Sequence, residues 1–349
     1  MIDFKAPYLD VLNQAWAEHL APRDANAPTL VSTFAGCGGS SLGFSMAGFR
    51  ELMAVEWDAN AVDILRLNFP HAHVHHGDIN DLATEDVLKI TGLAPGELDV
   101  LDGSPPCQGF STAGRRDAGD SRNQLFLQFT RLLDGVQPKC FVMENVSGMV
   151  KGEMKIIFAE ILRKLKSCGY RVSARLLNAK WFGVPQSRER LIFIGVRNDL
   201  GMEPSHPVQQ TAERILWQAI GHLDNIQNPE TGHVWIDESP AGRNTKNWLI
   251  AHKKRLPGKF AGQQKRSDIT KVSCALTTGG MKGMTAYIRN VGCHPKYTRT
   301  FSELEYRLIG SFPQQFQFIG NEVYRRVGNS VPPLFMRAIA NHIRENFFT

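Results

Sequence analysis

A regular alternation of short apolar runs and amphipathic segments extends from residue 29 to residue 197. The apolar runs have the length of strands, and the segments between them carry apolar residues at helical spacing. Strands that alternate with helices in this way predict a doubly wound, mostly parallel α/β sheet with helices on both faces. The expected strands are 29–34, 51–56, 74–76, 98–103, 141–144, 171–178 and 191–197, and the expected helices are 40–47, 60–68, 124–135 and 154–168.

The pattern divides the chain into four predicted regions. The first is an N-terminal extension, in which apolar residues from Leu9 to Leu20 recur at the spacing of one amphipathic helix. The second is the main α/β domain, and the third is a smaller, irregular domain that begins where the alternation stops. The fourth contains two helices, expected at 300–312 and 332–346, that return to the main domain. These regions are residues 1–28, 29–199, 200–298 and 299–349.

Positive charge is concentrated in one segment of the third region. Residues 243–296 hold 12 of the 40 basic residues of the chain and only one of its 34 acidic residues. The segment also contains Trp248, Phe260 and Tyr287, so it is expected to be folded. Basic charge interleaved with aromatic residues is typical of nucleic-acid binding. A solvated basic face is the alternative.

Cysteine and histidine usage gives no indication of a metal site. None of the six cysteines forms a Cys-x-x-Cys pair, and the histidines between His71 and His76 lack the further ligands of a tetrahedral site. We therefore expect no metal and interpret the histidines as part of a polar surface loop. The sequence shows no signal peptide and no long apolar span, which favours a cytoplasmic protein without a membrane partner.

A glycine-rich turn lies between the first expected strand and the first expected helix. Glycines there allow a tight turn and a close approach of a ligand to the backbone. Glu56 ends the second strand and could accept hydrogen bonds from ribose hydroxyls, while Trp57 offers a face for adenine. This pattern fits either a dinucleotide or S-adenosylmethionine. The expected cofactor contacts are Phe34, Ala35, Gly36, Cys37, Gly38, Gly39, Glu56, Trp57, Asp78 and Ile79.

Cys107 follows two prolines at the end of the fourth expected strand. Pro105 and Pro106 restrict the backbone, so the thiol is presented on a stiff segment, as suits a nucleophile. Most free cysteines are instead small buried side chains. The residues around Cys107 decide between the two interpretations.

Beyond residue 28 the chain resembles the C5-cytosine DNA methyltransferase family, of bacterial or phage type. The resemblance consists of many short blocks that occur in the order of the family, which makes it specific. The blocks are Phe34–Gly39, Glu56–Trp57, Gly77–Ile79, Pro106–Gln108, Phe110–Ser111, Asp120–Phe126, Glu144–Val146, Gln186–Arg190 and Arg326–Val331.

The resemblance implies a class I, Rossmann-like methyltransferase fold with a smaller target-recognition domain. It implies a sequence-specific DNA (cytosine-5)-methyltransferase that flips a cytosine out of double-stranded DNA. S-adenosylmethionine would be the cofactor and S-adenosylhomocysteine its product. A monomer associated with the nucleoid through DNA is expected, and a cognate restriction endonuclease is a further expected partner.

The same resemblance assigns roles to individual residues. Cys107 corresponds to the nucleophile, which adds to C6 of cytosine, and Glu144 to the acid that donates to N3. Arg190 corresponds to the arginine that contacts O2, and Arg188 would position the nucleophile loop or a phosphate. A plain ion pair is the alternative for Glu144 and Arg190. The closing cofactor block supplies Asn329 and Ser330, and the expected DNA contacts are Gln108, Ser111, Arg115, Arg116, Thr277, Thr278, Gly279 and Gly280.

One position departs from the family pattern. Many members carry an acid two residues before the loop phenylalanine, where this chain has Ser32. The contact to the methionine end of the cofactor is therefore expected to differ. We expect an active enzyme all the same, because Cys107, Glu144 and Arg190 are all present.

Four other interpretations are less consistent with the sequence. An amino-group methyltransferase would have an aromatic residue in place of Cys107. A tRNA cytosine methyltransferase would carry a Cys-Phe-Thr signature, which is absent. A nicotinamide-dependent oxidoreductase would leave the basic segment and the Pro-Cys-Gln block unexplained. An inactive DNA-binding relative would not need the intact set of site residues. The recognition sequence is expected to be read by residues 200–298.

Overall fold

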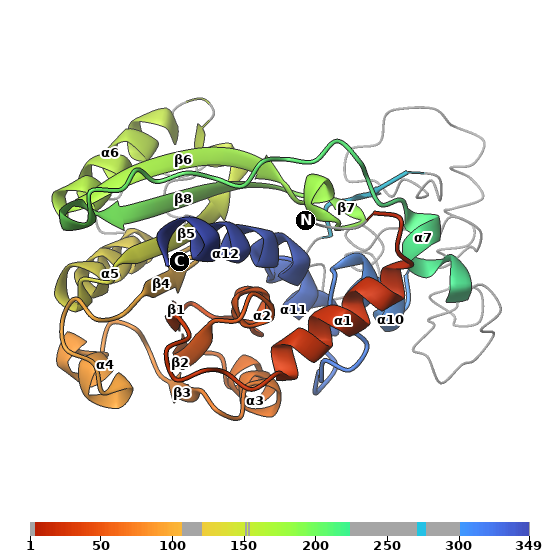
Figure 1. The fold of residues 1–349 in the computed structure, drawn as a ribbon, viewed down its shortest axis with the longest axis horizontal. Coiled ribbons are helices and arrows are strands. Elements are labelled where there is room, and N and C mark those ends of the chain that lie inside the picture. Colours follow the sequence, from red (N-terminus) through yellow and green to blue (C-terminus); the bar gives the residue numbers. More distant parts are fainter. Residues whose placement is uncertain are drawn as a thin grey trace.

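Seven strands form one sheet at the centre of the protein (Figure 1). The structure is a computed structural model that describes residues 4–106, 121–150, 152, 154–223, 271–276 and 301–348. The order of the strands across the sheet is β3-β2-β1-β4-β5-β8-β6. Their bounds are β1 Thr29–Thr33, β2 Arg50–Glu56, β3 His73–His76, β4 Val100–Gly103, β5 Cys140–Val146, β6 Tyr170–Asn178 and β8 Glu189–Arg197.

Helices cover both faces of this sheet, as the alternating pattern predicts. Leu30 of β1 belongs to one apolar cluster and its neighbour Val31 to the other, because successive side chains of a strand point to opposite faces. The first cluster includes side chains of α1 (Tyr8–Leu20), α2 (Gly39–Met46), α3 (Ala59–Asn68) and α12 (Pro333–Phe347). The second includes side chains of α4 (Thr84–Thr91), α5 (Ser121–Val136) and α6 (Met154–Ser167).

The order of the strands reverses between β1 and β4. From β1 the chain continues outward through β2 and β3, and it then returns to β4 on the other side of β1 and continues to β5. All of these neighbouring pairs are parallel. In open α/β sheets, ligands bind at the carboxyl ends of the strands where such a reversal occurs. The loops after β1, β2 and β4 therefore define the region where a site is expected.

Strand β8 is the exception in a sheet that is otherwise parallel. It lies between β5 and β6 and is antiparallel to both. The sequence predicts the strand but not its direction, because an apolar run has the same pattern either way. A short parallel pair, β7 (Gln186–Ser187) and β9 (Ser273–Cys274), joins the segment before β8 to residues 271–276.

The N-terminal helix α1 packs into the first apolar cluster. Tyr8, Leu12 and Ala15 are buried on one face of α1, and the Tyr8 hydroxyl donates a 2.8 Å hydrogen bond to the carbonyl oxygen of Leu308. The helix that the sequence predicts in residues 1–28 is therefore present, and its apolar face is covered by the main body. Helix α7 (Leu216–Ile220) also contributes to this cluster, although it belongs to the predicted second domain.

Several helices differ from the sequence prediction or were not expected, among them α5, which begins three residues earlier than expected, and α7. The helix expected at 300–312 is shorter, because α10 (Glu303–Ile309) begins at a capping box formed by Ser302 and Glu305. Helix α4, which the sequence did not predict, is only eight residues long and has a single fully buried residue, Val87. Helix α11 (Val323–Asn329), which the sequence did not predict, lies just before α12 in the chain.

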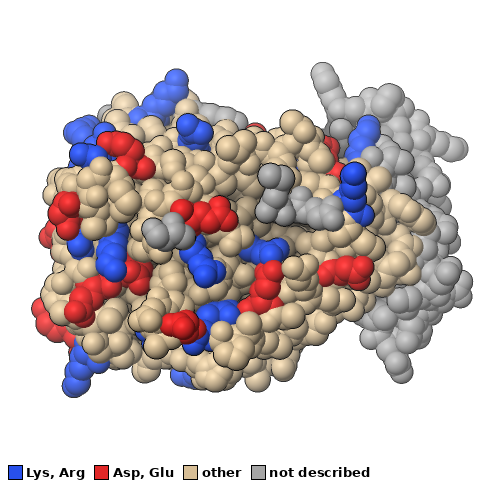
Figure 2. Space-filling view, in the orientation of Figure 1, with Lys and Arg blue, Asp and Glu red and all other residues tan. Residues whose placement is uncertain are grey.

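Charges of both signs are interspersed on the face shown in Figure 2. The basic segment 243–296 lies almost entirely outside the described residues, so its charge contributes little to this picture. Among the helices that the structure describes, none is long and apolar enough to cross a membrane.

Candidate functional site

The glycine-rich turn after β1 adopts a backbone that requires glycine at several positions. Gly36 and Gly38 have φ angles of 56° and 89°, and Phe34 has a φ angle of 54°. These values lie in the left-handed region, which glycine adopts without a steric penalty. The turn is closed by a 2.9 Å hydrogen bond from the Gly38 amide to the carbonyl oxygen of Ala35.

The surroundings of the glycines separate a packed side of the turn from an open one. A Cβ atom on Gly39 would lie 2.4 Å from the carbonyl oxygen of Val331, and one on Gly38 would lie 2.5 Å from the Phe69 ring. A Cβ atom on Gly36 would meet no atom within 4 Å. The turn is thus packed against α11–α12 and α3, and it leaves space for a ligand beside Gly36.

Glu56 fixes the position of the turn relative to β2. Its Oε2 accepts a 2.7 Å hydrogen bond from the amide of Gly36. Its Oε1 accepts hydrogen bonds from the amides of Trp57 and Asp58, at 3.1 and 3.0 Å. These three amides hold a buried carboxylate at the carboxyl end of β2, next to the turn.

The other residues predicted to contact adenosine differ in exposure. Trp57 is 74% exposed, so its indole face is open to a ligand. Asp78 is exposed, and its Oδ1 accepts a 2.9 Å hydrogen bond from the amide of Asn80. The side chain of Ile79, in contrast, is buried in the second apolar cluster. The Ile79 side chain therefore does not face a ligand on the surface, and its carbonyl oxygen accepts a 3.0 Å hydrogen bond from Arg131.

The C-terminal block contacts the glycine turn from the other side. The hydroxyl of Ser330 lies 3.0 Å from the Cys37 sulfur and donates a 2.8 Å hydrogen bond to the Arg326 carbonyl oxygen. Cys37 is fully buried, and burial raises the pKa of its thiol to about 11. The Cys37 side chain therefore faces α11, so this residue could contact a cofactor only through its backbone. Asn329 is exposed at the end of α11.

Arg326 connects this block to the loop after β2. Its guanidinium donates hydrogen bonds to Asp58 at 2.6 Å, to Asn60 at 2.9 Å and to Glu322 at 2.6 Å. Arg326 is only 7% exposed, so these charge-assisted bonds are shielded from water. Arg326, in the predicted closing cofactor block, is thus bonded to the loop that follows Glu56 and Trp57.

A second group of polar residues lies at the ends of β5 and β8. The Nε of Arg190 is 2.5 Å from the Oε1 of Glu144, and both side chains are largely buried. The antiparallel register pairs Val146 with Arg190 and Glu144 with Ile192, which brings the acid and the arginine together. The structure therefore brings these two predicted catalytic residues into contact.

Asn145 connects this pair to the segment that carries Cys107. Its Nδ2 donates a 3.1 Å hydrogen bond to the carbonyl oxygen of Pro105, and the residue is 4% exposed. Cys107 itself lies outside the described residues. Since Cys107 is two residues beyond Pro105 in the chain, the segment that leads to Cys107 is held by the neighbour of Glu144.

Arg188 has a different environment from that of Arg190. It is 3% exposed and donates hydrogen bonds to the carbonyl oxygens of Leu276, at 2.9 Å, and Gly328, at 2.8 Å. Gln186 accepts a 2.9 Å hydrogen bond from the Leu276 amide. Burial lowers the pKa of Arg188 to about 9. Of the two predicted roles, contact with a phosphate does not agree with this burial.

The predicted DNA contacts cannot be placed. Gln108, Ser111, Arg115 and Arg116 belong to residues 107–120, and Thr277, Thr278, Gly279 and Gly280 directly follow Leu276. All eight lie outside the described residues.

Two polar residues of this region, Asn145 and Asp102, are not singled out individually by the sequence. Asn145 belongs to a block that matches the family, but only the neighbouring Glu144 was assigned a role. Asp102 interrupts the apolar run of β4 and is 2% exposed. A charged residue inside a buried run is the sequence signal that would have identified it.

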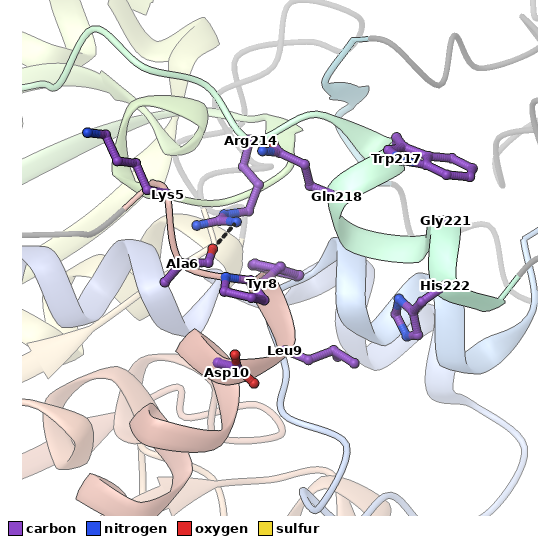
Figure 3. Close-up of a pocket in the computed structure, with 11 residues that line it drawn as sticks. Lys5, Ala6, Tyr8, Leu9, Asp10, Arg214, Trp217, Gln218, Gly221 and His222 are labelled. Carbon is purple, nitrogen blue, oxygen red and sulfur yellow. Dashed lines mark hydrogen bonds between the residues drawn. The ribbon is translucent and has the colours of Figure 1, made fainter.

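A cavity among the described residues lies away from this site. It has a volume of about 540 Å³ and lies between the start of α1 and helix α7. Figure 3 shows Arg214 reaching across it toward Ala6, to whose carbonyl oxygen it donates a 3.1 Å hydrogen bond. None of the predicted cofactor or catalytic residues lines this cavity. In the part of the chain that the structure describes, no group of three His, Cys, Asp or Glu side chains is placed to hold a metal ion.

Comparisons with known proteins agree with this arrangement. The family model of the C-5 cytosine-specific DNA methylases matches residues 29–345. The type II methyltransferase M1.HphI of Haemophilus parahaemolyticus is 34% identical over 338 residues, which cover 90% of this chain and 86% of the relative. The type II methyltransferase M.NgoPII of Neisseria gonorrhoeae is 32% identical over 344 residues, which cover 94% and 98%.

A solved structure supports the fold. The Dnmt2 methyltransferase of S. pombe superimposes with a TM-score of 0.66 and 17% identity, over 93% of this chain and 100% of that one. The predicted class I methyltransferase fold is confirmed by this likeness.

Proposed function

Since this chain belongs to the C-5 cytosine-specific DNA methylase family, we propose that it methylates C5 of a flipped cytosine within a specific sequence of double-stranded DNA. The chain is a DNA (cytosine-5)-methyltransferase, and the identity of its reacting groups is the part we propose. The contact between Glu144 and Arg190, beside the segment that leads to Cys107, is the observation that carries the proposal.

The residues around the glycine turn fit S-adenosylmethionine. Gly36 leaves open space on one side of the turn, and Glu56 and the exposed Trp57 lie at its edge. Glu56 would hold the ribose hydroxyls, and Trp57 would stack on adenine. When bound, this cofactor supplies a methyl group on a sulfonium, and its product is S-adenosylhomocysteine.

Cys107 is the proposed nucleophile. Its thiolate would form a bond to C6 of cytosine, and the electron pair of the C5–C6 double bond would shift so that C5 becomes nucleophilic. The same thiolate leaves when the C5 proton has been lost and the double bond forms again. A thiol needs a cationic or dipolar environment to ionise near neutral pH. Arg190, whose side chain is largely buried against Glu144, supports such an environment at this end of the sheet.

Glu144 and Arg190 would bind the target base. A protonated Glu144 would donate to N3 of cytosine and draw charge away from C6, which favours thiolate addition. Arg190 would donate to O2 while it holds the carboxyl group of Glu144 in place. Arg188 would act indirectly, because its guanidinium joins Leu276 and Gly328 beneath this pair.

The remaining parts of the chain would bind and select DNA. Residues 109–119 would close over the flipped base, and the base would be extruded at a cost of a few kcal/mol. Residues 200–298 would form the target-recognition domain, with 29–199 and 299–349 forming the catalytic part. Because the relatives M1.HphI and M.NgoPII are type II methyltransferases, a cognate restriction endonuclease is part of the proposal. We also propose that the protein acts as a cytoplasmic monomer on the nucleoid.

A covalent trapping experiment tests the chemistry. Duplex DNA that contains 5-fluorocytosine in place of cytosine should form a denaturant-stable adduct with the protein when S-adenosylmethionine is present. Bisulfite sequencing of DNA from an expressing host first identifies the target site to use. Cys107→Ser should bind the same DNA without forming the adduct. An adduct that persists in Cys107→Ser, or DNA binding without any adduct in the wild type, would refute the assignment of Cys107.

A further inference from the structure

A buried carboxyl group near the carboxyl end of β4 has no role in the proposed reaction. Asp102 is 2% exposed, and its Oδ2 accepts a 2.5 Å hydrogen bond from the hydroxyl of Ser40. Its other oxygen, Oδ1, is buried and has no hydrogen-bond partner in the described part of the chain. Buried polar atoms in native proteins are nearly always paired, so such an oxygen indicates a missing ligand, ion or water.

Asp102 lies between the two loops of the proposed site. Ser40, which binds its carboxyl group, is in the first turn of α2, directly after the glycine turn 34–39. Asp102 is also five residues before Cys107 in the chain. Strand β4 lies next to β1, at the reversal of strand order where sheets of this type bind ligands. The carboxyl group of Asp102 is therefore bonded to the residue that directly follows the turn assigned to the cofactor.

The register of the sheet connects Asp102 with the one departure from the family pattern. Ser32 on β1 is the Cα partner of Asp102 on β4. Both side chains contact α2, because the hydroxyl oxygens of Ser32 and Ser41 are 3.4 Å apart and Ser40 donates a hydrogen bond to Asp102. Neighbouring strands are about 4.8 Å apart, so a carboxyl group at either of these positions can reach nearly the same region. In this chain an acid is thus present one strand away from Ser32, the position at which the family resemblance implies an acid.

We propose that Asp102 binds the ammonium group of the methionine part of the cofactor through its free Oδ1. This inference rests on the proposed use of S-adenosylmethionine. An ammonium group offers three N–H donors and a positive charge, which match an anionic acceptor that is only half satisfied. Asp102 would thereby supply the acid that Ser32 does not.

The electrostatic environment of Asp102 agrees with this role. Burial, together with the nearby carboxyl groups of Glu51 and Glu144, raises the pKa of Asp102 to about 7. A bound cation favours the ionised form of a neighbouring acid and would offset both effects. The protein without cofactor thus holds a carboxyl group that is poorly compensated until a cation arrives.

Glu51 offers a matched control. It is a second buried acid on the same face of the sheet, with one oxygen held by Ser41 at 2.7 Å and the other, Oε2, without a partner in the described chain. Its position differs, because Glu51 is near the start of β2, five residues before Glu56. Asp102 is level with Ser32 and with Ala54 of β2, so Glu51 lies three residues farther from the carboxyl ends of the strands, although it is near enough to influence the pKa of Asp102.

Calorimetric binding of three ligands to Asp102→Asn tests the proposal. S-adenosylmethionine and S-adenosylhomocysteine both contain the ammonium group, and 5′-methylthioadenosine lacks the amino-acid part. Asp102→Asn should bind the first two at least 10-fold more weakly than the wild type and should bind 5′-methylthioadenosine within about twofold, since roughly one charge-assisted hydrogen bond is removed. Glu51→Gln should leave all three affinities within about twofold. The double variant Ser32→Asp/Asp102→Asn should recover most of the lost affinity.

The outcomes separate this inference from the proposed function. An equal loss for all three ligands, or no loss for any, would overturn the role of Asp102. A wild-type protein that binds none of the three would instead refute the use of S-adenosylmethionine. Asp102→Ser serves as the second variant if Asp102→Asn does not fold, and the same pattern of affinities is expected from it.

Discussion

The side-chain amide of Asn145 is hydrogen-bonded to the carbonyl oxygen of Pro105, and this bond joins the end of β5 to the start of the segment that carries Cys107. Asn145 is the neighbour of Glu144, so one short stretch of β5 both presents the acid and fixes the nucleophile segment. The contact is buried, which shields it from competition with water. It holds the Pro105 segment against the strand that carries Glu144.

Replacing Asn145 with Ala should therefore slow catalysis more than it weakens binding. Loss of the bond frees the Pro105 segment, and a displacement of about 1 Å at a reacting group can reduce a rate about 100-fold. We expect kcat to fall by roughly 10- to 100-fold, while the Kd for S-adenosylmethionine stays unchanged. Single-turnover methylation and calorimetry measure the two quantities.

Asn346→Ala is the control for this substitution. Its Nδ2 also donates to a backbone carbonyl oxygen, that of His342, but on the exposed face of α12. It should leave kcat at the wild-type value. A normal kcat in Asn145→Ala, or a reduced one in both variants, would contradict the proposed positioning role.

The buried guanidinium of Arg188 leads to a prediction about stability. Arg188→Lys keeps a positive charge but can satisfy only one of the two carbonyl oxygens, of Leu276 and Gly328, that the guanidinium binds. A buried acceptor left without a donor costs about 1–3 kcal/mol. We expect a loss of that size in the free energy of unfolding, measured by urea denaturation.

Arg171→Lys provides the comparison for Arg188→Lys. Arg171 pairs with Glu203 at 2.8 Å on the surface, where both side chains are largely exposed to solvent. Exposed ion pairs contribute about 0–1 kcal/mol, so the unfolding free energy should change little. Equal effects of the two substitutions would show that the buried bonds of Arg188 do not stabilise the fold.

The fold was predictable from the sequence where local patterns determine structure. Strands β1 and β2 and helices α2 and α3 lie within one residue of their expected bounds, because their apolar patterns are strong. The antiparallel direction of β8 was not predictable, since it depends on pairing with β5 and β6 across the sheet. Helix α4 was not expected, although its sequence is amphipathic, because it is only eight residues long.

The site shows the same division between local and tertiary information. The sequence identifies Glu144 and Arg190 through their blocks, and the structure brings them into contact. The sequence places Cys37 in the predicted cofactor turn but does not indicate that the Cys37 side chain faces Ser330. The partnership of Ser32 and Asp102 depends on the register of β1 and β4, which no spacing along the chain reveals.

The buried acid Glu51 makes stability depend on pH in a predictable direction. Burial raises the pKa of Glu51 from an ordinary value of 4.5 to about 7 in the folded protein. The folded state then holds more protons than the unfolded state between these values, so stability falls as pH rises from about 4.5 to 7. Each unit of pKa shift corresponds to about 1.4 kcal/mol, which gives an effect on the order of 3 kcal/mol.

Comparison of the wild type with Glu51→Gln at each pH isolates this effect. The control is needed because burial lowers the pKa values of His19 and His206 to about 4, so these histidines make stability rise between about pH 4 and 6.5. Glutamine can still bind Ser41 but does not ionise. Thermal unfolding of the cofactor-free proteins from pH 5 to pH 8 should show Glu51→Gln gaining stability relative to the wild type as pH rises. A constant difference over that range would contradict the shifted pKa.

The N-terminal helix should contribute to the stability of the catalytic body, because one face of α1 is buried in its core. Leu12 is 1% exposed, whereas Leu20 on the same helix is 63% exposed, so the two leucines form a matched pair. Leu12→Ala removes buried methyl groups and leaves a cavity, which should cost about 2–5 kcal/mol of unfolding free energy. Leu20→Ala should change it by less than about 0.5 kcal/mol. Urea denaturation followed by tryptophan fluorescence measures both, and equal effects would mean that α1 does not stabilise the fold through its buried face.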